Sequence, residues 1–74
     1  MESNQVKPGI YKHFKGSFIE VLGVGKHTET KEDFVLYRHL DGDYPLWVRP
    51  LSMFLEHVSR DGYDGPRFVL VKEF

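Results

Sequence analysis

The 74-residue sequence contains no cysteine, one tryptophan and no long hydrophobic run. Without cysteine, neither a disulfide nor a thiolate zinc site can stabilise the fold. No apolar run approaches the roughly 20 residues that span a bilayer, so we expect no membrane partner. The first residues lack the charged and apolar regions of a signal peptide. We therefore expect a soluble, cytoplasmic domain that is stabilised by packing alone.

The formal net charge of −1 lacks the basic excess of a general electrostatic nucleic-acid binder. Residues 1–31 nevertheless carry five Lys against three acids, so a local basic face is still open. Six Phe and four Tyr accompany the single Trp. Each aromatic side chain buries roughly 150–250 Å², which gives so short a chain the material for a core.

The chain is a series of short apolar runs separated by turn-forming residues. Alternation of apolar and polar side chains predicts strands over 10–14, 17–26, 34–40, 46–49 and 67–71, and 55–60 could form a further strand. Two glycines inside the second run, Gly23 and Gly25, predict a bend or bulge. Turns are predicted at 8–9, 15–17 and 41–45, and 61–66 is expected to be a turn-rich loop.

The densest apolar segment runs from residue 46 to residue 58 and is interrupted by Pro50. Proline cannot donate to a strand ladder, so we expect it to end the strand before it. One helical turn is predicted over 51–54. The core is expected to take its side chains from Leu46, Val48, Leu51, Met53 and Phe54.

These patterns predict an all-β protein. Five or six strongly bent antiparallel strands, one short helical turn near Leu51–Phe54 and no long helix favour a small SH3-like barrel. We expect a flexible N-terminus over 1–8, a single barrel domain over 9–74, and a monomer rather than an oligomer.

The order of several short motifs resembles a bacterial family catalogued as domain of unknown function 1653. The matching stretches cover about residues 9–71 and share the motifs Tyr-x-His-x-Lys-Gly at 11–16, Glu-Val-Leu-Gly-Val at 20–24, His-Thr-Glu-Thr at 27–30, Val-Leu-Tyr-Arg at 35–38, Leu-Trp-Val-Arg-Pro-Leu-x-Met-Phe at 46–54 and Pro-Arg-Phe at 66–68. The resemblance implies a small SH3-like β domain in a bacterial cytoplasmic setting. It implies no catalytic residue, because the family has no settled activity.

An aromatic and arginine set is the main candidate for a binding site. On small barrels, exposed aromatic rings bind peptides or stack nucleobases, and Arg adds cation–π or phosphate contacts. Trp47 and Arg49 share one face of their predicted strand. An alternative places Trp47 in the core, with Arg49 bridging a carboxylate such as Glu29 or Glu56. The candidate ligand-binding residues are Trp47, Arg49, Tyr37, Arg38 and Tyr11.

The four histidines suggest a second kind of site, because neutral imidazole is a common metal ligand. His27 and Glu29 are two residues apart, so on a strand they would share a face. His13 could join them if its strand lay alongside. Against this, no compact His-x-x-x-His or Glu-x-x-His spacing is present, and capped or half-exposed histidines explain the pattern equally.

Three functions from different classes follow. The first is a non-catalytic binding module that uses the Trp47/Arg49 face for a protein, nucleic acid or nucleotide. The second is a metal-binding or metal-assisted hydrolase domain that uses His13, His27 and Glu29. The third is a structural accessory that associates through an exposed edge strand. No serine lies in a nucleophile elbow and no phosphate-binding loop is present, so we expect no enzyme and no cofactor.

Overall fold

The structure is a computed structural model, and it describes residues 6–74. Seven strands and one short helix follow one another along the chain. They are β1 (Gly9–His13), β2 (Phe18–Lys26), β3 (Asp33–His39), β4 (Leu46–Pro50), α1 (Leu51–Phe54), β5 (His57–Arg60), β6 (Tyr63–Pro66) and β7 (Phe68–Glu73).

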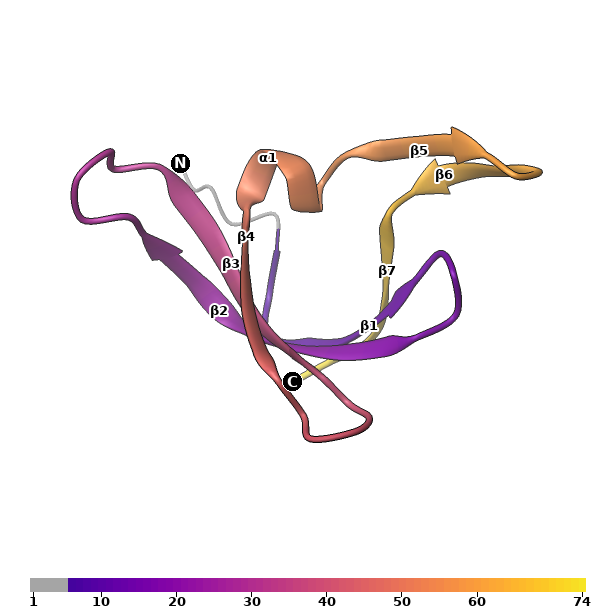
Figure 1. The fold of residues 1–74 in the computed structure, drawn as a ribbon, viewed down its shortest axis with the longest axis horizontal. Helices are drawn as coiled ribbons and strands as arrows, with labels where there is room; N and C mark the ends of the chain where they lie inside the picture. Colours follow the sequence, from indigo (N-terminus) through magenta and orange to yellow (C-terminus); the bar gives the residue numbers. More distant parts are fainter. Residues whose placement is uncertain (1–5) are drawn as a thin grey trace.

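Five strands form one antiparallel sheet in the order β4-β3-β2-β1-β7, and β5 and β6 form a separate hairpin. Figure 1 shows that the sheet curves strongly and that α1 leads from the end of β4 into the hairpin. The all-β class and the single helical turn at Leu51–Phe54 are confirmed. Within residues 6–74, β4 and β7 remain the two edges of the sheet, so the bent strands do not close into a barrel.

The bend in β2 comes from its glycine-containing segment. The pairing of β2 with β3 shifts register between Val21 and Gly23, which leaves one extra residue on the β2 side. A bulge of this kind bends the strand that carries it and increases its twist. The sequence predicted this irregularity correctly, and it curves the sheet around the core.

The segment 61–66 differs from its prediction. Asp61 and Gly62 both have positive φ, at 53° and 80°, and they join β5 directly to β6. Two positive φ angles in a two-residue loop produce a twist that matches two paired strands, so the chain forms a tight hairpin here. The loop expected over 61–66 is therefore only the two-residue turn, and Tyr63–Pro66 is a strand.

The core lies on the concave face of the sheet beneath α1. The rings of Phe54 and Phe68 stack with centroids 4.3 Å apart, and Tyr11 meets Phe54 edge-on at 5.7 Å. Ile19, Val21 and Val35 are completely buried. The buried cluster is Val6, Tyr11, Ile19, Val21, Val35, Tyr37, Phe54 and Phe68.

The expected core assignment of the segment 46–54 is partly wrong. Leu46 and Val48 are exposed, at 61% and 59%, and Met53 is exposed as well. In β4 it is Trp47 that lies opposite the buried Tyr37 of β3. Directly opposed residues of an antiparallel pair share a face, so Trp47 and Arg49, which lie opposite the buried Tyr37 and Val35, occupy the concave face of β4. Leu46 and Val48 therefore point outward.

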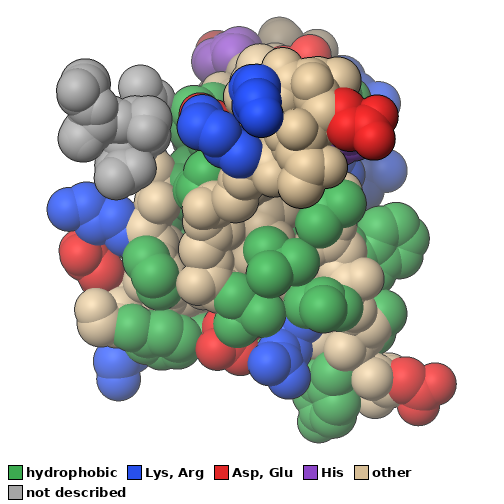
Figure 2. Space-filling model, turned by 90° about the vertical axis from the view of Figure 1, so that its left-hand side faces the viewer, with side chains coloured by type: hydrophobic (Ala, Val, Ile, Leu, Met, Phe, Trp, Pro, Cys, Tyr) green, Lys and Arg blue, Asp and Glu red, His purple; other side chains and the backbone are tan. Residues whose placement is uncertain are grey.

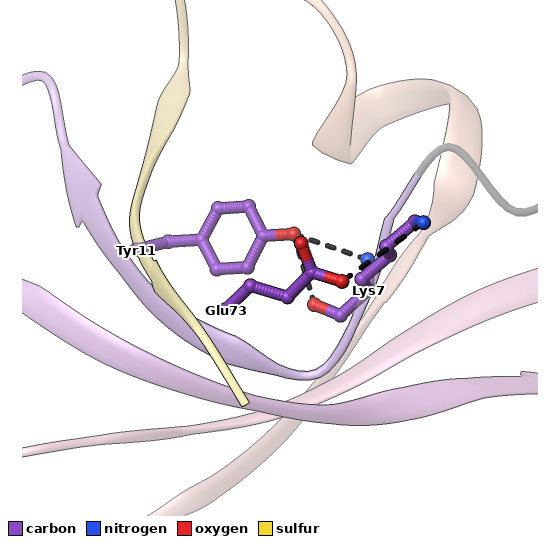
Figure 3. Close-up of polar contacts among 3 residues, drawn as sticks. All are labelled: Lys7, Tyr11 and Glu73. Carbon is purple, nitrogen blue, oxygen red and sulfur yellow. Dashed lines mark hydrogen bonds and ion pairs between the residues drawn. The ribbon is translucent and has the colours of Figure 1, made fainter.

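The start of the described chain is attached to the domain by polar contacts (Figure 3). The Tyr11 hydroxyl donates to the Lys7 carbonyl at 2.9 Å and accepts from the Lys7 N–H at 3.1 Å. The Lys7 ammonium lies 3.9 Å from the Glu73 carboxylate, and Val6 is buried. Residues 6–8 thus pack against the sheet, and the rest of the N-terminus predicted to be flexible lies outside the described residues.

No helix within residues 6–74 has the length and apolar character needed to cross a membrane.

Candidate anion-binding site

The structure separates the five predicted ligand-binding residues into three environments. Tyr11 and Tyr37 are in the core, with 6% and 3% of their surface exposed. Tyr37 packs against the stacked rings of Phe54 and Phe68, with its ring centroid 6.0 Å from each of theirs. These two tyrosines stabilise the concave face and offer little ring surface to a ligand.

Arg38 lies on the outer face of β3. Its Nε is 3.5 Å from a carboxylate oxygen of Glu20, the residue directly opposite it in β2. This cross-strand ion pair already satisfies its charge. Arg38 therefore does not share a surface with Arg49, which lies on the concave side of β4.

Trp47 stands at the rim of the concave face. About half of its surface is exposed, at 52%, and its ring meets that of His39 at 5.7 Å in an edge-on arrangement. The alternative in which Trp47 is a core residue is therefore wrong. A half-exposed Trp beside a His provides a flat surface on which a ligand can rest.

Arg49 reaches inward from the same face of β4. Its guanidinium carbon lies 5.9 Å from the centre of the Phe68 ring, within the range of a cation–π contact. Its Nε is buried and makes no hydrogen bond within residues 6–74. Arg38 and Arg67 also have a buried Nε without a hydrogen bond.

What distinguishes Arg49 from the other two arginines is the lack of a carboxylate partner. Arg38 pairs with Glu20, and the Arg67 guanidinium pairs with Glu56 at 2.9 Å. No ion pair to Arg49 occurs within the described part of the chain. The proposed bridge from Arg49 to Glu56 is therefore not formed, because Glu56 is taken by Arg67. A buried guanidinium edge without an acceptor is energetically costly and suits an anionic partner.

The Arg49 side chain forms one wall of a small pocket of about 200 Å³. Four basic side chains from three strands and one turn converge there, and the described lining contains no carboxylate. The pocket is lined by His13, Lys15, Ser17, Ile19, Tyr37, His39, Arg49 and Phe68. Its charge is opposite in sign to that of the chain as a whole, which is −1.

The positive potential of this pocket affects His13. Burial lowers the pKa of His13 below its ordinary value, and the nearby charges of Arg67, Arg49, Lys15 and His39 lower it further. The backbone N–H of Lys15 donates to Nδ1 of His13 at 3.1 Å, which fixes the ring. A bound anion would reverse this unfavourable field, so it would raise the pKa of His13.

Two basic residues of the pocket, Lys15 and His39, were not among the predicted site residues. Lys15 belongs to the turn after β1, and His39 lies directly opposite Ile19 on the concave face. In the sequence, the two residues share only one feature, which is that each is a polar residue near the end of a predicted strand. The curvature of the sheet, which brings these ends to Arg49, is not visible in the sequence.

The predicted metal site is not formed. Within residues 6–74, no three His, Cys, Asp or Glu side chains lie close enough to hold a metal ion. His27 instead caps its own loop, because its Nδ1 accepts from the backbone N–H groups of Glu29 and Thr30. His13 lies in the basic pocket described above, so His13, His27 and Glu29 do not converge.

The comparison with known protein families decides the relationship of this chain. A family described as a protein of unknown function (DUF1653) matches residues 9–70. The chain belongs to the DUF1653 family. The resemblance found in the sequence motifs is thereby confirmed. No curated protein matches this sequence.

A solved structure from the same family supports the fold of this DUF1653 chain. It is the crystal structure of a family member from Bordetella bronchiseptica, with a TM-score of 0.86 and 31% sequence identity. The similarity covers 99% of this chain and 96% of that chain. The shared fold therefore extends over nearly all of both chains.

Proposed function

We propose that this DUF1653 domain is a non-catalytic binding module that recognises an anionic group in the Arg49 pocket. The observation that carries the proposal is the arginine itself. Its Nε is buried without a hydrogen bond, and it has no ion pair within residues 6–74. Lys15, His13 and His39 surround the same cavity.

The size of the pocket supports a small terminal group rather than a whole ligand. A volume of about 200 Å³ is below the roughly 300–1,000 Å³ of sites that enclose drug-sized molecules. Such a cavity suits a carboxylate or phosphate group whose remaining part lies outside. Trp47 is placed at the rim, next to His39, to contact that remaining part.

The composition of the pocket supports binding rather than catalysis. A general acid–base pair or an activated nucleophile needs groups with matched pKa values in mutual contact. The lining offers basic side chains, aromatic rings and two hydroxyl-bearing side chains, Ser17 and Tyr37. Arg and Lys hold an anion by charge and hydrogen bonds, and no carboxylate in the lining opposes them.

The test is a titration of the protein with inorganic phosphate at pH 6, followed by amide chemical shifts. Sodium chloride of matched ionic strength serves as the reference, because it screens charges without filling the pocket. We expect saturable shifts at the amides of His13, Lys15 and Arg49. Non-saturating shifts equal to those in chloride would contradict the proposal.

Two arginine variants make the test specific. Arg49→Met should abolish the saturable shifts, because it removes the guanidinium but keeps an unbranched side chain over Phe68. Arg38→Met is the matched control, since it removes the same charge from the opposite face of the sheet. Equal weakening by both variants would mean that the effect is one of net charge and not of a site.

A further inference from the structure

The free edge of β4 has main-chain groups available for another strand. The His39 N–H donates to the Pro45 carbonyl at 3.1 Å, so these two residues form a hydrogen-bonded pair. Hydrogen-bonded and non-hydrogen-bonded pairs alternate along an antiparallel ladder. Trp47 and Arg49 therefore direct their N–H and C=O toward β3. Leu46 and Val48 direct theirs outward, where no strand of residues 6–74 pairs with them.

The side chains at this edge are also unusually apolar. Leu46, Trp47 and Val48 are all more than half exposed, at 61%, 52% and 59%. Natural edge strands usually carry charges, prolines or bulges that block pairing with another strand. In β4 the first proline inside the strand comes only at Pro50, after three consecutive exposed apolar residues. A free edge of this kind is a template for strand addition.

An apolar groove runs beside the edge on the outer face of the sheet. It has a volume of about 400 Å³ and includes Val48, Leu36, Phe34 and Leu22, with Gly23 and Gly25 also in its lining. A Cβ added at either glycine would meet no atom within 4 Å. The two glycines therefore keep the groove open. Figure 2, which views the molecule from the left-hand side of Figure 1, shows hydrophobic side chains exposed across its lower half.

We infer that the ligand of this domain is an extended peptide segment of a partner protein with one acidic residue. The segment adds to β4 as a further antiparallel strand. Its main chain bonds Leu46 and Val48, its acidic side chain meets Arg49, and its apolar side chains lie along the groove. This inference rests on the proposed anion site, and it adds the chemical class of the partner.

The geometry of a strand fixes the pattern of such a segment. A residue opposite Val48 would place its side chain on the outer face, next to the groove. The preceding residue of the segment would lie opposite Arg49 and point to the concave face. An acidic residue followed directly by an apolar one therefore satisfies both surfaces at once. A second apolar residue, two positions later, would lie beside Leu46.

The observations favour a peptide over a second copy of this chain. A two-fold pairing of β4 with itself could use the N–H groups of Leu46 and Val48 only, because Pro50 has no N–H and the Tyr44 N–H already donates to the Asp41 carbonyl. It would also place Arg49 opposite Pro45 of the other copy and leave the guanidinium without an anion. A single-stranded nucleic acid could supply the anion and stack on Trp47, but it has no strand ladder to offer the edge.

The probe is the hexapeptide acetyl-Thr-Glu-Val-Thr-Val-Thr-amide, titrated into the whole chain. Amide hydrogen exchange is measured residue by residue. We expect exchange at Leu46 and Val48 to slow by about tenfold at saturation, because their N–H groups become hydrogen-bonded. Exchange at Trp47, whose N–H already faces β3, should not change. Shifts in the Arg49 pocket should accompany the protection.

Three matched probes separate the contributions. Replacing Glu by Gln in the peptide should remove the shifts in the pocket and weaken binding at least about fivefold. Methylating the nitrogen of the first Val keeps the charge but removes the donor, so protection at Leu46 and Val48 should vanish. The protein variant Gly25→Val should weaken the peptide by filling the groove, while phosphate binding stays unchanged.

Four outcomes would overturn the inference. If phosphate and the Glu peptide both shift the pocket but Leu46 and Val48 stay unprotected, strand addition fails and the anion site survives. If neither ligand binds, both proposals fail. If oligothymidylate binds the pocket more tightly than the peptide does, the ligand of the pocket is a nucleic acid. Protection at Leu46 and Val48 that rises with protein concentration alone would assign the edge to a second copy.

Discussion

The two faces of β4 carry side chains opposite to those expected for a strand that covers a core. The face toward the interior has Trp47 and Arg49, which forms no ion pair within residues 6–74, and the face toward solvent has Leu46 and Val48. In a domain this small, apolar surface left outside and an arginine left without a carboxylate both reduce stability. Features that reduce stability without a gain in packing are most often found at functional sites. The comparison therefore supports the proposal that β4 carries the binding surface.

The largest expected effect concerns the concave side. Phe54→Ala should destabilise the protein by about 3–5 kcal/mol, because it removes a ring that is 3% exposed and stacked on Phe68. In so short a chain this loss is comparable to the whole stability. Urea unfolding followed by Trp47 fluorescence measures it. Met53→Ala, one residue earlier and 46% exposed, is the control. A similar loss for both would mean that α1 is not docked as described.

A pair of valines tests the two faces with identical chemistry. Val35, opposite Arg49 on the concave face, is completely buried, whereas Val48 is 59% exposed on the outer face. Val35→Ala should cost about 2 kcal/mol for two buried methyl groups and the cavity they leave. Val48→Ala should cost only about 0.5 kcal/mol or less. Equal costs in chemical denaturation would reverse the assignment of the faces.

A pair of arginines sharpens the comparison, because their effects should have opposite signs. Arg49→Met removes a positive charge from beside His13, His39 and Lys15, so stability at pH 7 should stay equal or rise by about 0.5 kcal/mol. Arg38→Met breaks the partly exposed pair with Glu20 and should cost about 0.5 kcal/mol. Both are measured at low salt. A larger loss for Arg49→Met would indicate a structural role for that arginine.

The smallest effect is a dependence on pH. Burial and the neighbouring Arg67, Arg49, Lys15 and His39 hold the pKa of His13 below its value in the unfolded chain, about 6.5. As the pH falls through that value, the unfolded chain takes up more protons than the folded chain. This part of the stability is therefore present above pH 6.5 and is lost as the pH falls toward the folded pKa.

The measurement is the urea midpoint between pH 7.5 and pH 5. His13→Gln should flatten the decrease toward acid, and Arg49→Met should reduce it, because it removes one of the charges that oppose protonation. Added phosphate should also reduce it by pairing with protonated His13. If the urea midpoint falls equally steeply with pH in His13→Gln and in the unmodified protein, His13 is not the cause of the pH dependence.

The strands and turns were largely predictable from the sequence because they depend on local chemistry. Alternation identified most strands, and Pro50 correctly ended β4 and preceded the helical turn. The consecutive residues Asp61 and Gly62 correctly indicated a turn. The short strand after them is rich in turn-forming residues and was predicted as loop. Gly65 and Pro66 disfavour a strand locally, and only pairing with β5 overrides that preference.

The site was predictable only in part. Trp47 and Arg49 were correctly placed on one strand face, because side chains alternate in any strand. Tyr11 and Tyr37 were grouped with them, although both rings are needed in the core. Lys15 and His39 were missed because they reach Arg49 only through the curvature of the sheet. His13 was assigned to a metal site and lies instead in the basic pocket.

By itself, the sequence determined an all-β domain, its family, and the two sets of side chains on β4. The period of two along a strand specifies these sets but gives no preference for which of them is buried. Only the tertiary structure decided that, since burial depends on the register of β4 against β3 and on the packing of α1 against β7, which comes from a distant part of the chain. That choice placed Trp47 and Arg49 on the concave face and left Leu46 and Val48 exposed on the outer face.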